Sequence, residues 1–547
     1  MIILLDHRGG FTASIDGGPA TAVDNLAAFV ALHERSHPRW VWDDTSWWYP
    51  QLLEAGVRVE RCWDLRLCHV ILRSSLLTTG SALARASRGA WDEPRPRQRA
   101  ATDDALFALD DEPREEHADP ATEYAAQRAA VEGSAQPARI ELLLAVESAG
   151  ALIAAELRHA GLPWDRDAHD AILTELLGPR PRAGERPAKL SAVLERVSAA
   201  LDMPDLNPDS PVELLRSLRL AGLNVNSTGK WELREHDHPV VEPLLEYKSL
   251  ARLLSANGWA WLDAWVVDGR FRPDYVPGGV VTGRWATSGG GALQLPRQIR
   301  GAVVADPGWS LVVADASQLE PRILAALAGD GAMIAAGAQG DLYAGMVASG
   351  AVDTREHAKV GMLGAMYGGT TGASGQVLPR LARAFPQAIG LVEEAARAGE
   401  RGERVMTRLG RTSPLPSEAW AMAQSDAGGE LATAASTAQA RSRARAWGRF
   451  TRNFVVQGTA AEWALCWMAG IRRGLTELAA GAWFTESAHL VFFLHDEVVV
   501  HAPSGQADRV VEIVQEAAAD AGRLLFSPRE VAFPLTVAVV RSYGEAK

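Results

Sequence analysis

Residues 311–322 read LVVADASQLEPR, an apolar run that is followed at once by an acid, Asp315, and then by polar residues. Residues 489–502 read HLVFFLHDEVVVHA, in which two apolar runs predict a hairpin whose turn carries Asp496. Strand ends hold a side chain rigidly while leaving it open to solvent. Alone, each aspartate is more typical of an ordinary turn. If the fold brings both carboxylates together, their mutual repulsion favours a divalent cation beside them.

The segment 355–369, REHAKVGMLGAMYGG, predicts a helix that stops at its terminal pair of glycines. Four residues spaced four apart share one face of this helix: Arg355, Lys359, Leu363 and Tyr367. Two cations one turn apart repel each other, which makes sense if a polyphosphate lies against them. The alternative is an ordinary solvated basic face.

Together these segments resemble the three polymerase motifs of the A family of DNA polymerases, the bacterial DNA polymerase I type. The family forms are D-Y-S-Q-I-E-L-R, R-x-x-x-K-x-x-x-F-G-x-x-Y-G and H-D-E, and the matching residues are 315–322, 355–368 and 495–497. Further stretches agree in order with family segments: TGRWATS (282–288), TRLGRTSPLP (407–416), VVQGTAAE (455–462) and SYGEAK (542–547). The resemblance covers about residues 140–547.

This resemblance implies an α+β multidomain protein with a right-hand polymerase fold over residues 139–547. The helical thumb is expected at about 190–265 and the helical fingers at about 330–440, with the palm as the remainder. The implied reaction adds dNTPs to a primer 3′-hydroxyl on a DNA template. It would use two Mg²⁺ ions, for which Mn²⁺ can substitute. A monomeric, cytoplasmic and nucleoid-associated enzyme of DNA repair or gap filling is expected.

The resemblance also assigns roles to individual residues. The metal ligands would be Asp315 and Asp496, supported by Glu497. The nucleotide-binding residues would be Gln318, Glu320, Arg355, Lys359, Leu363 and Tyr367, with Glu320 excluding ribonucleotides and hydrogen-bonded to Tyr367. The DNA-binding residues would be Arg284, Arg449, Asn453, Gln457 and His495. A phosphate track is expected along the basic segment Arg441, Arg443, Arg445, Arg449 and Arg452. The chain departs from the family at Ala316, Pro321 and Leu363, which bears on sugar selection and fidelity more than on activity.

Residues 1–138 are expected to form an α/β domain of the ribonuclease H-like, 3′–5′ exonuclease type, with a linker-like insertion at 83–122. The stretch TEYAAQRAAVE resembles the family's third exonuclease motif, Y-A-A-x-D, with Tyr124 kept. Arg128, however, stands where a metal-binding aspartate belongs, and a cation cannot hold Mg²⁺. Trp48 falls near the second-motif acid, and no D-x-E motif precedes it. Proofreading is therefore expected to be lost; the alternative is a bifunctional exonuclease and polymerase.

Composition limits the class of protein without deciding it. The formal net charge of −12 argues against a uniformly basic surface but not against a local basic groove. The chain has three cysteines without metal-ligand spacing, and no apolar run long enough to span a membrane. Its N-terminus lacks the basic region of a signal peptide. Two other functions stay open: a non-catalytic DNA-binding relative, and an RNA polymerase of the single-subunit phage type. Glu320 and the Q-G-T-A-A segment favour DNA synthesis.

Overall fold

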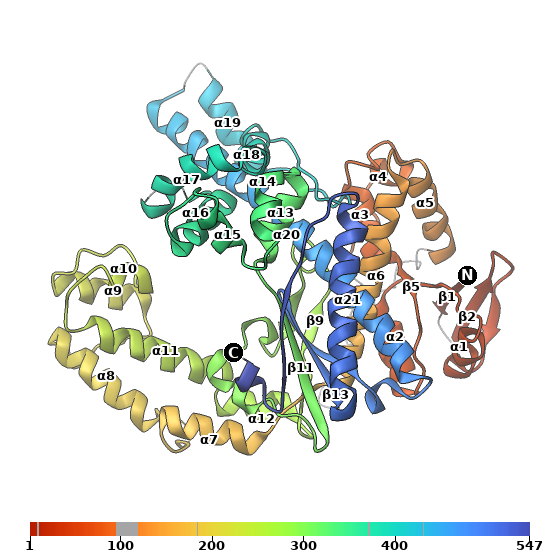
Figure 1. The fold of residues 1–547 in the computed structure, drawn as a ribbon, viewed down its shortest axis with the longest axis horizontal. Coiled ribbons are helices and arrows are strands. Elements are labelled where there is room, and N and C mark those ends of the chain that lie inside the picture. The colour runs from red at the N-terminus through yellow and green to blue at the C-terminus, as the bar shows by residue number, and fades with distance from the viewer. Residues whose placement is uncertain (8–9, 94–118, 183, 370–371, 430–431, 547) are drawn as a thin grey trace, which may run out of the picture.

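The computed structural model describes residues 1–547 except for 8–9, 94–118, 183, 370–371, 430–431 and 547. Figure 1 shows an N-terminal α/β part, a projecting helical arm and a helical lobe arranged around a central sheet. These parts are described in the order in which they position the candidate site.

The central sheet is antiparallel, with the strand order β12-β13-β11-β14. The strands β12, β13 and β11 are nearly continuous runs of buried residues, mostly Val, Leu and Phe, a pattern that is typical of strands covered on both faces. Helix α21 packs on β11, β13 and β14, and α20 packs on β12 and on α21. The elements are β11 (Trp309–Ala316), α20 (Ala434–Ala479), β12 (His489–Leu494), β13 (Glu497–Pro503), α21 (Ala507–Phe526) and β14 (Leu535–Val540), with the short helices η3 (Phe484–Glu486), η4 (Ser504–Gln506) and η5 (Tyr543–Ala546) between or after them.

A helical arm projects from the sheet between α7 and α12 (Figure 1). It has a separate hydrophobic core, which runs from Leu190 to Tyr247 and is fully buried at Val197, Leu218 and Leu244. The expected helical thumb region is therefore helical and folds around its own core. Its helices are α7 (Arg166–Leu177), α8 (Ala188–Leu201), α9 (Pro211–Leu220), α10 (Lys230–Leu233), α11 (Val241–Asn257) and α12 (Trp259–Trp265).

Short strands and turns connect this arm to the sheet. Two small sheets have the orders β6-β8-β7 and β10-β9. The elements are β6 (Leu162–Pro163), β7 (Val266–Val267), β8 (Arg270–Phe271), β9 (Asp274–Val276), β10 (Ala286–Gly289), η1 (Ala292–Gln294) and η2 (Arg297–Ala302).

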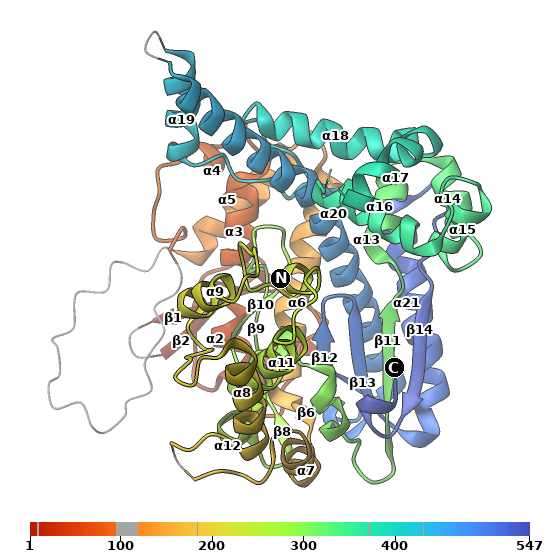
Figure 2. The ribbon, with the colours of Figure 1, turned by 90° about the vertical axis from the view of Figure 1, so that its left-hand side faces the viewer.

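The second helical lobe lies above the sheet in Figures 1 and 2. Helix α20 links the two regions, because its first turns pack against α18 and α19 and its later turns against α6 and α21. This helix is 46 residues long and begins with a capping box at Thr433. The lobe contains α13 (Leu319–Ala328), α14 (Gly331–Gly337), α15 (Leu342–Ala348), α16 (Arg355–Tyr367), α17 (Gly372–Ala384), α18 (Pro386–Glu400) and α19 (Glu418–Gly428).

The N-terminal part is an α/β layer. Its sheet has the order β3-β2-β1-β4-β5, in which β1, β4 and β5 are parallel and β2 and β3 antiparallel to their neighbours. The elements are β1 (Ile2–His7), β2 (Gly10–Ile15), β3 (Thr21–Val23), α1 (Leu26–Glu34), β4 (Trp40–Trp42), α2 (Thr45–Glu54), β5 (Cys62–Asp64), α3 (Leu65–Ser74), α4 (Ala82–Arg85), α5 (Pro120–Glu132) and α6 (Pro137–Ala160).

A buried ionic cluster fixes this layer to the rest of the molecule. Glu156 on α6 receives hydrogen bonds from Tyr49 (2.6 Å), Arg58 (2.9 Å) and Arg472 of α20 (2.7 Å). Arg472 also donates to the carbonyl oxygen of Glu60 at 2.6 Å. Removing one partner of a buried pair typically costs about 3–5 kcal/mol. The N-terminal layer is therefore an integral part of this molecule.

The linker-like insertion expected at 83–122 is shorter in the structure. Helix α4 covers the first residues of this stretch, and helix α5 covers its last residues. Helix α5 begins at Pro120, because the Asp119 side chain caps its N-terminus. The part from 94 to 118 lies outside the described residues. In the described part of the chain, no helix is both long and apolar enough to cross a membrane.

Candidate active site

The structure places the two predicted aspartates on neighbouring strands. Asp315 is the penultimate residue of β11 and lies opposite Glu497 in the register with β13. Asp496 immediately precedes β13, and its carbonyl oxygen accepts a hydrogen bond of 2.9 Å from the Ala316 amide. Both aspartates are partly exposed. Both aspartates therefore lie at strand ends, as the apolar runs beside them predicted.

The predicted hairpin of β12 and β13 is also confirmed, with a two-residue turn between Leu494 and Glu497. His495 in this turn has a φ of +59°, a conformation that is uncommon for residues other than glycine and recurs at functional sites. Burial, followed by the nearby charge of Arg284, lowers the pKa of His495 below its ordinary value of 6.5.

Glu497 occupies a different environment from the two aspartates, because it is only 2% exposed. Its Oε1 accepts hydrogen bonds from Arg300 at 3.3 Å and from the Tyr543 hydroxyl. The Arg300 guanidinium lies 4.4 Å from the centre of the Tyr543 ring. Glu497 thus anchors the start of β13 to two elements distant in sequence. Sequence reasoning missed both partners, although the SYGEAK stretch contains Tyr543.

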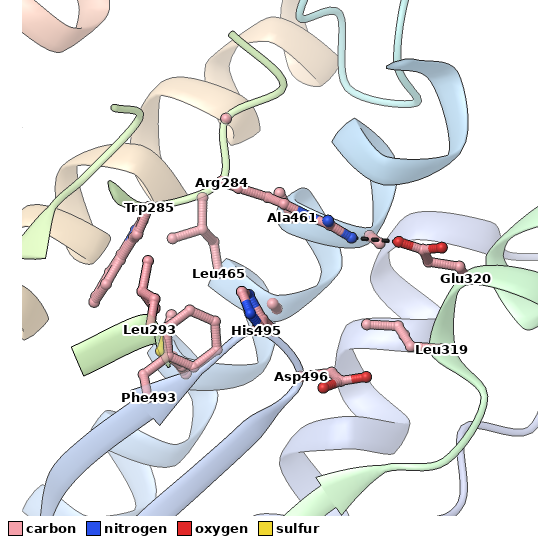
Figure 3. A pocket seen from close by; sticks show the side chains of 14 residues that line it. Arg284, Trp285, Leu293, Leu319, Glu320, Ala461, Leu465, Phe493, His495 and Asp496 are labelled. Carbon is pink, nitrogen blue, oxygen red and sulfur yellow. Dashed lines mark hydrogen bonds and ion pairs between the residues drawn. The ribbon is translucent and has the colours of Figure 1, made fainter. Parts of the chain in front are cut away.

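A hydrogen-bond network spans the space above the aspartates. Glu320, at the start of α13, forms an ion pair with Arg284 through Oε1 (Figure 3). Its Oε2 accepts a hydrogen bond of 2.7 Å from the Tyr367 hydroxyl, as predicted. Gln457 donates to the same hydroxyl at 3.1 Å. Four residues assigned from separate motifs are therefore brought into contact, and we call them the Glu320 network: Arg284, Glu320, Tyr367 and Gln457.

Helix α16 ends at Gly368 (φ +78°), close to the predicted glycine stop. Arg355 at its first turn donates to Asp341 at 2.8 Å. Burial alone would raise the pKa of Asp341, but hydrogen bonds from Arg355, the Ala344 amide and Gln318 lower it to about 2. Sequence reasoning missed Asp341, which accepts a hydrogen bond of 2.8 Å from Gln318.

The remaining residues of the predicted α16 face are open to solvent. Leu363 is 38% and Tyr367 40% exposed. Lys359 is exposed, and in the described part of the chain it makes no ion pair. This cation is therefore available to an anionic ligand.

Helix α20 carries Arg449, Asn453 and Gln457 at successive turns, as predicted. The aliphatic part of Arg449 packs on Gly368, where a Cβ atom would lie 2.7 Å from its Cγ. Arg452 donates to the Ala365 carbonyl oxygen at 2.9 Å, so one cation of the basic segment supports α16. Arg443 likewise donates to a backbone carbonyl, while three arginines are exposed: Arg441, Arg445 and Arg449.

Beside Asp496 lies a cavity of about 310 Å³. Its wall is largely apolar and includes Trp285, Leu465 and Phe493 (Figure 3). Arg284, Glu320, His495 and Asp496 also line it. A largely apolar cavity with a few convergent polar groups is the usual form of a ligand site.

Glu462 on α20 gives the molecule a titratable buried group behind this site. Burial raises its pKa from 4.5 to about 7, although Thr407 and the Leu409 amide donate hydrogen bonds to it. A folded-state pKa above the unfolded value adds stability that is complete below pH 4.5 and is lost as the pH rises through about 7.

We therefore expect Glu462→Gln to raise the melting temperature more at pH 8 than at pH 5, relative to the unaltered protein. Thermal denaturation at several pH values measures the difference. An effect of the same size at both ends of this range would contradict the assigned titration.

A sequence profile described as DNA polymerase family A matches residues 221–545, which is more than half of the chain. The thermostable DNA polymerase I of Thermus filiformis is 28% identical over 357 residues, covering 60% of this chain and 39% of that protein. DNA polymerase I of Chloroflexus aurantiacus is 28% identical over 346 residues, covering 58% and 34%. The chain thus spans less than two fifths of the length of these curated relatives.

The fold is similar to a solved structure, the POL domain of Pol1 from M. smegmatis in complex with DNA primer-template and dNTP. The TM-score is 0.68 at 18% identity, and the match covers 100% of this chain and 95% of that one. The expected α+β multidomain, right-hand polymerase architecture is therefore confirmed. From the matched profile and this fold, the chain belongs to DNA polymerase family A.

Proposed function

We propose that the protein is a template-directed DNA polymerase, which adds dNTPs to the 3′-hydroxyl of a primer. The observation that carries this proposal is the meeting of Asp315 and Asp496 at the end of one sheet, below the Glu320 network. The proposed substrates are primer-template DNA and dNTPs. Both are named for the similar M. smegmatis structure.

The aspartates fit a divalent metal site, because their carboxylates come from adjacent backbone positions and Mg²⁺ prefers oxygen ligands. Asp315 and Asp496 would hold two Mg²⁺ ions, with Mn²⁺ as a substitute. When bound, such ions stabilise the charge on the attacking and leaving oxygens of a phosphoryl displacement. Glu497 supports this site from behind through Arg300 and Tyr543.

The chain's own residues would position the two substrates. Lys359 and Arg355 on α16 face the triphosphate, with Gln318 and Leu363 beside the incoming nucleotide. Arg284, Gln457 and His495 contact the primer-terminal pair, where the minor groove offers acceptors common to all correct pairs. Arg449 and Asn453 contact the template side.

We propose that residues 139–547 comprise three subdomains, a proposal that the helical arm and the helical lobe support. The thumb corresponds to the arm at about 190–265, the fingers to the lobe at about 330–440, and the palm to the remainder. The proposal includes a monomeric, cytoplasmic and nucleoid-associated enzyme in DNA repair or gap filling.

Primer extension tests the function directly. The purified protein should lengthen a labelled primer on a DNA template when dNTPs and Mg²⁺ are supplied, and much less with rNTPs. Extension with rNTPs alone would favour the RNA polymerase alternative. DNA binding without extension in Mg²⁺ or Mn²⁺ would favour a non-catalytic relative.

Glu320→Ala should raise the use of rNTPs relative to dNTPs. Its carboxylate is held by Arg284 and Tyr367, so it occupies a fixed position where a 2′-hydroxyl would be unfavourable. We expect the ratio of kcat/KM for rNTP to that for dNTP to increase by roughly 10²-fold. Glu418→Ala, at an acid in the first turn of the distant helix α19, is the matched control. An unchanged ratio would show that another residue excludes ribonucleotides.

We further propose that the N-terminal α/β domain, residues 1–138, is a degenerate 3′–5′ exonuclease-type domain without proofreading activity. Trp48 is fully buried and donates to Asp43 at 2.7 Å, so an indole occupies this part of the domain. Arg128 pairs with Glu141 at 2.7 Å, and its guanidinium lies 5.8 Å from the ring centre of Trp63. These contacts support the proposal that positions which bind metal in the family have structural roles in this chain.

Acids elsewhere in this domain are also engaged in structural roles. Asp44 caps α2, and both oxygens of Asp64 accept backbone amides, from Thr45 at 2.7 Å and Leu67 at 3.0 Å.

Incubation with a 3′-mismatched primer and Mg²⁺ or Mn²⁺, without dNTPs, should leave the primer intact. If shortening occurs and survives Asp315→Ala but is lost when residues 1–135 are deleted, the domain is an active exonuclease.

A further inference from the structure

The backbone that precedes Arg284 of the Glu320 network packs against Arg411, which lies outside the network. Gly283 has a φ of +87°, and a Cβ atom there would lie 2.5 Å from Nε of Arg411. The guanidinium therefore lies directly against the backbone that precedes Arg284. The turn itself is tight, because the Gly283 amide donates to the Val280 carbonyl oxygen at 2.7 Å. Any movement of Arg411 would be transmitted to the residue that pairs with Glu320.

Arg411 is itself held in place by a buried acid. Its guanidinium forms an ion pair with Glu147 of α6, and the two side chains are 11% and 1% exposed. The ion pair with Glu147 thus holds Arg411 in place beside Gly283. A planar guanidinium is suited to this position, because it can pack against backbone and pair with a carboxylate together.

Arg411 belongs to a hairpin, residues 405–413, that also contacts the other side of the network. Thr407 lies against Gly458, where a Cβ atom would be 2.4 Å from its Cγ2. The Arg408 amide donates to Thr459 at 3.1 Å. These contacts follow Gln457 directly along α20, so the hairpin supports the backbone on both sides of the network.

The N-terminal layer contacts this hairpin directly. Ser75 is fully buried and donates to the Gly410 carbonyl oxygen at 2.7 Å. The Leu76 amide donates to Thr412 at 2.9 Å. Leu77 packs on Gly410, where a Cβ atom would lie 2.7 Å from its Cδ1. A continuous series of contacts therefore connects the α3–α4 segment to Arg284.

We propose that Arg411 is a positioning residue for nucleotide selection, and that the N-terminal layer acts on selection through the 405–413 hairpin. Arg411 sets the position of Arg284, Arg284 sets Glu320, and the Ser75–Leu77 segment restrains the hairpin. This gives the N-terminal layer a role in synthesis that needs no exonuclease activity. The inference rests on the proposed polymerase function.

The test compares the rNTP to dNTP ratio of kcat/KM for the full chain and its variants. Arg411→Ala should raise this ratio roughly tenfold and increase KM for dNTP more than it lowers kcat. Arg411→Lys keeps the charge that pairs with Glu147 but lacks the planar guanidinium that packs on Gly283. Its rNTP to dNTP ratio should therefore lie between those of the unaltered protein and of Arg411→Ala. Leu77→Ala should shift the ratio in the same direction by a smaller factor.

Arg58→Ala is the matched control, because Arg58 joins the N-terminal layer to α20 through a hydrogen bond of 2.8 Å to Thr476, away from the hairpin. It should lower the melting temperature without changing the ratio. In a Glu320→Ala background, Arg411→Ala should add nothing further to the ratio, since the group it positions is gone.

The outcomes separate the two claims. If the unaltered protein does not extend a primer, the proposed function fails. If it does, and Arg411→Ala leaves the ratio unchanged, or Arg58→Ala changes it equally, the positioning role is refuted. An additive effect of Arg411→Ala in the Glu320→Ala background would also refute it.

Discussion

Asp315→Asn and Asp496→Asn should each reduce primer extension by about 10³-fold or more, while duplex DNA binding changes by no more than about twofold. Both side chains lie where β11 meets the start of β13, and asparagine keeps their shape while removing the charge that would hold a divalent cation. DNA affinity should persist because phosphate contacts are spread over many other residues. Single-turnover extension and a fluorescence binding assay measure the two quantities.

Asp306→Asn is the matched control for these variants. Asp306 precedes β11 at the far end of the same strand and pairs with Arg270. Its substitution removes one carboxylate near the sheet without touching the candidate metal site, so extension should remain near the original rate. Near-original extension by either Asp315→Asn or Asp496→Asn would instead refute the assignment of these residues to the metal site.

Lys359→Ala should lower kcat/KM for dNTP by roughly 10²-fold, mainly through KM, with little change in DNA affinity. Lys359 is an exposed cation on the α16 face that also bears Tyr367, whose hydroxyl bonds to Glu320. A charge-assisted contact with a triphosphate is among the stronger polar interactions in proteins. Steady-state kinetics at saturating primer-template measure the effect.

Arg380→Ala provides the control, because Arg380 is a cation of the same lobe that pairs with Asp353. Its loss should leave the use of dNTP unchanged. If Lys359→Ala weakened DNA binding and spared the dependence on dNTP concentration, α16 would face the nucleic acid and not the nucleotide.

Local patterns predicted the parts of the site that lie within one element. The repeat of four residues from Arg355 through Lys359 and Leu363 to Tyr367 placed these side chains on one helical face, and α16 ends at Gly368. The apolar runs around Asp496 predicted the hairpin of β12 and β13. Helical and strand periodicities fix such relations because each depends only on neighbouring residues.

The contacts that hold these elements together were not visible in the pattern. Arg300 and Tyr543 meet at Glu497 from positions nearly 250 residues apart in sequence, and composition gives no sign of such a pairing. Arg411 and Glu147 are likewise separated by 264 residues. Long-range pairs depend on the packing of whole layers, so they follow from the fold and not from local propensity.

The proposed function of the chain is templated addition of a deoxynucleotide, and one measurement tests it most directly. A primer-template with a single unpaired template base is incubated with the protein, Mg²⁺ and each dNTP in turn, for all four template bases. The proposed function predicts one-nucleotide extension by the complementary dNTP at every template base, and no detectable extension by Asp315→Asn. Failure to extend in both Mg²⁺ and Mn²⁺, or addition that ignores the template base, would contradict it.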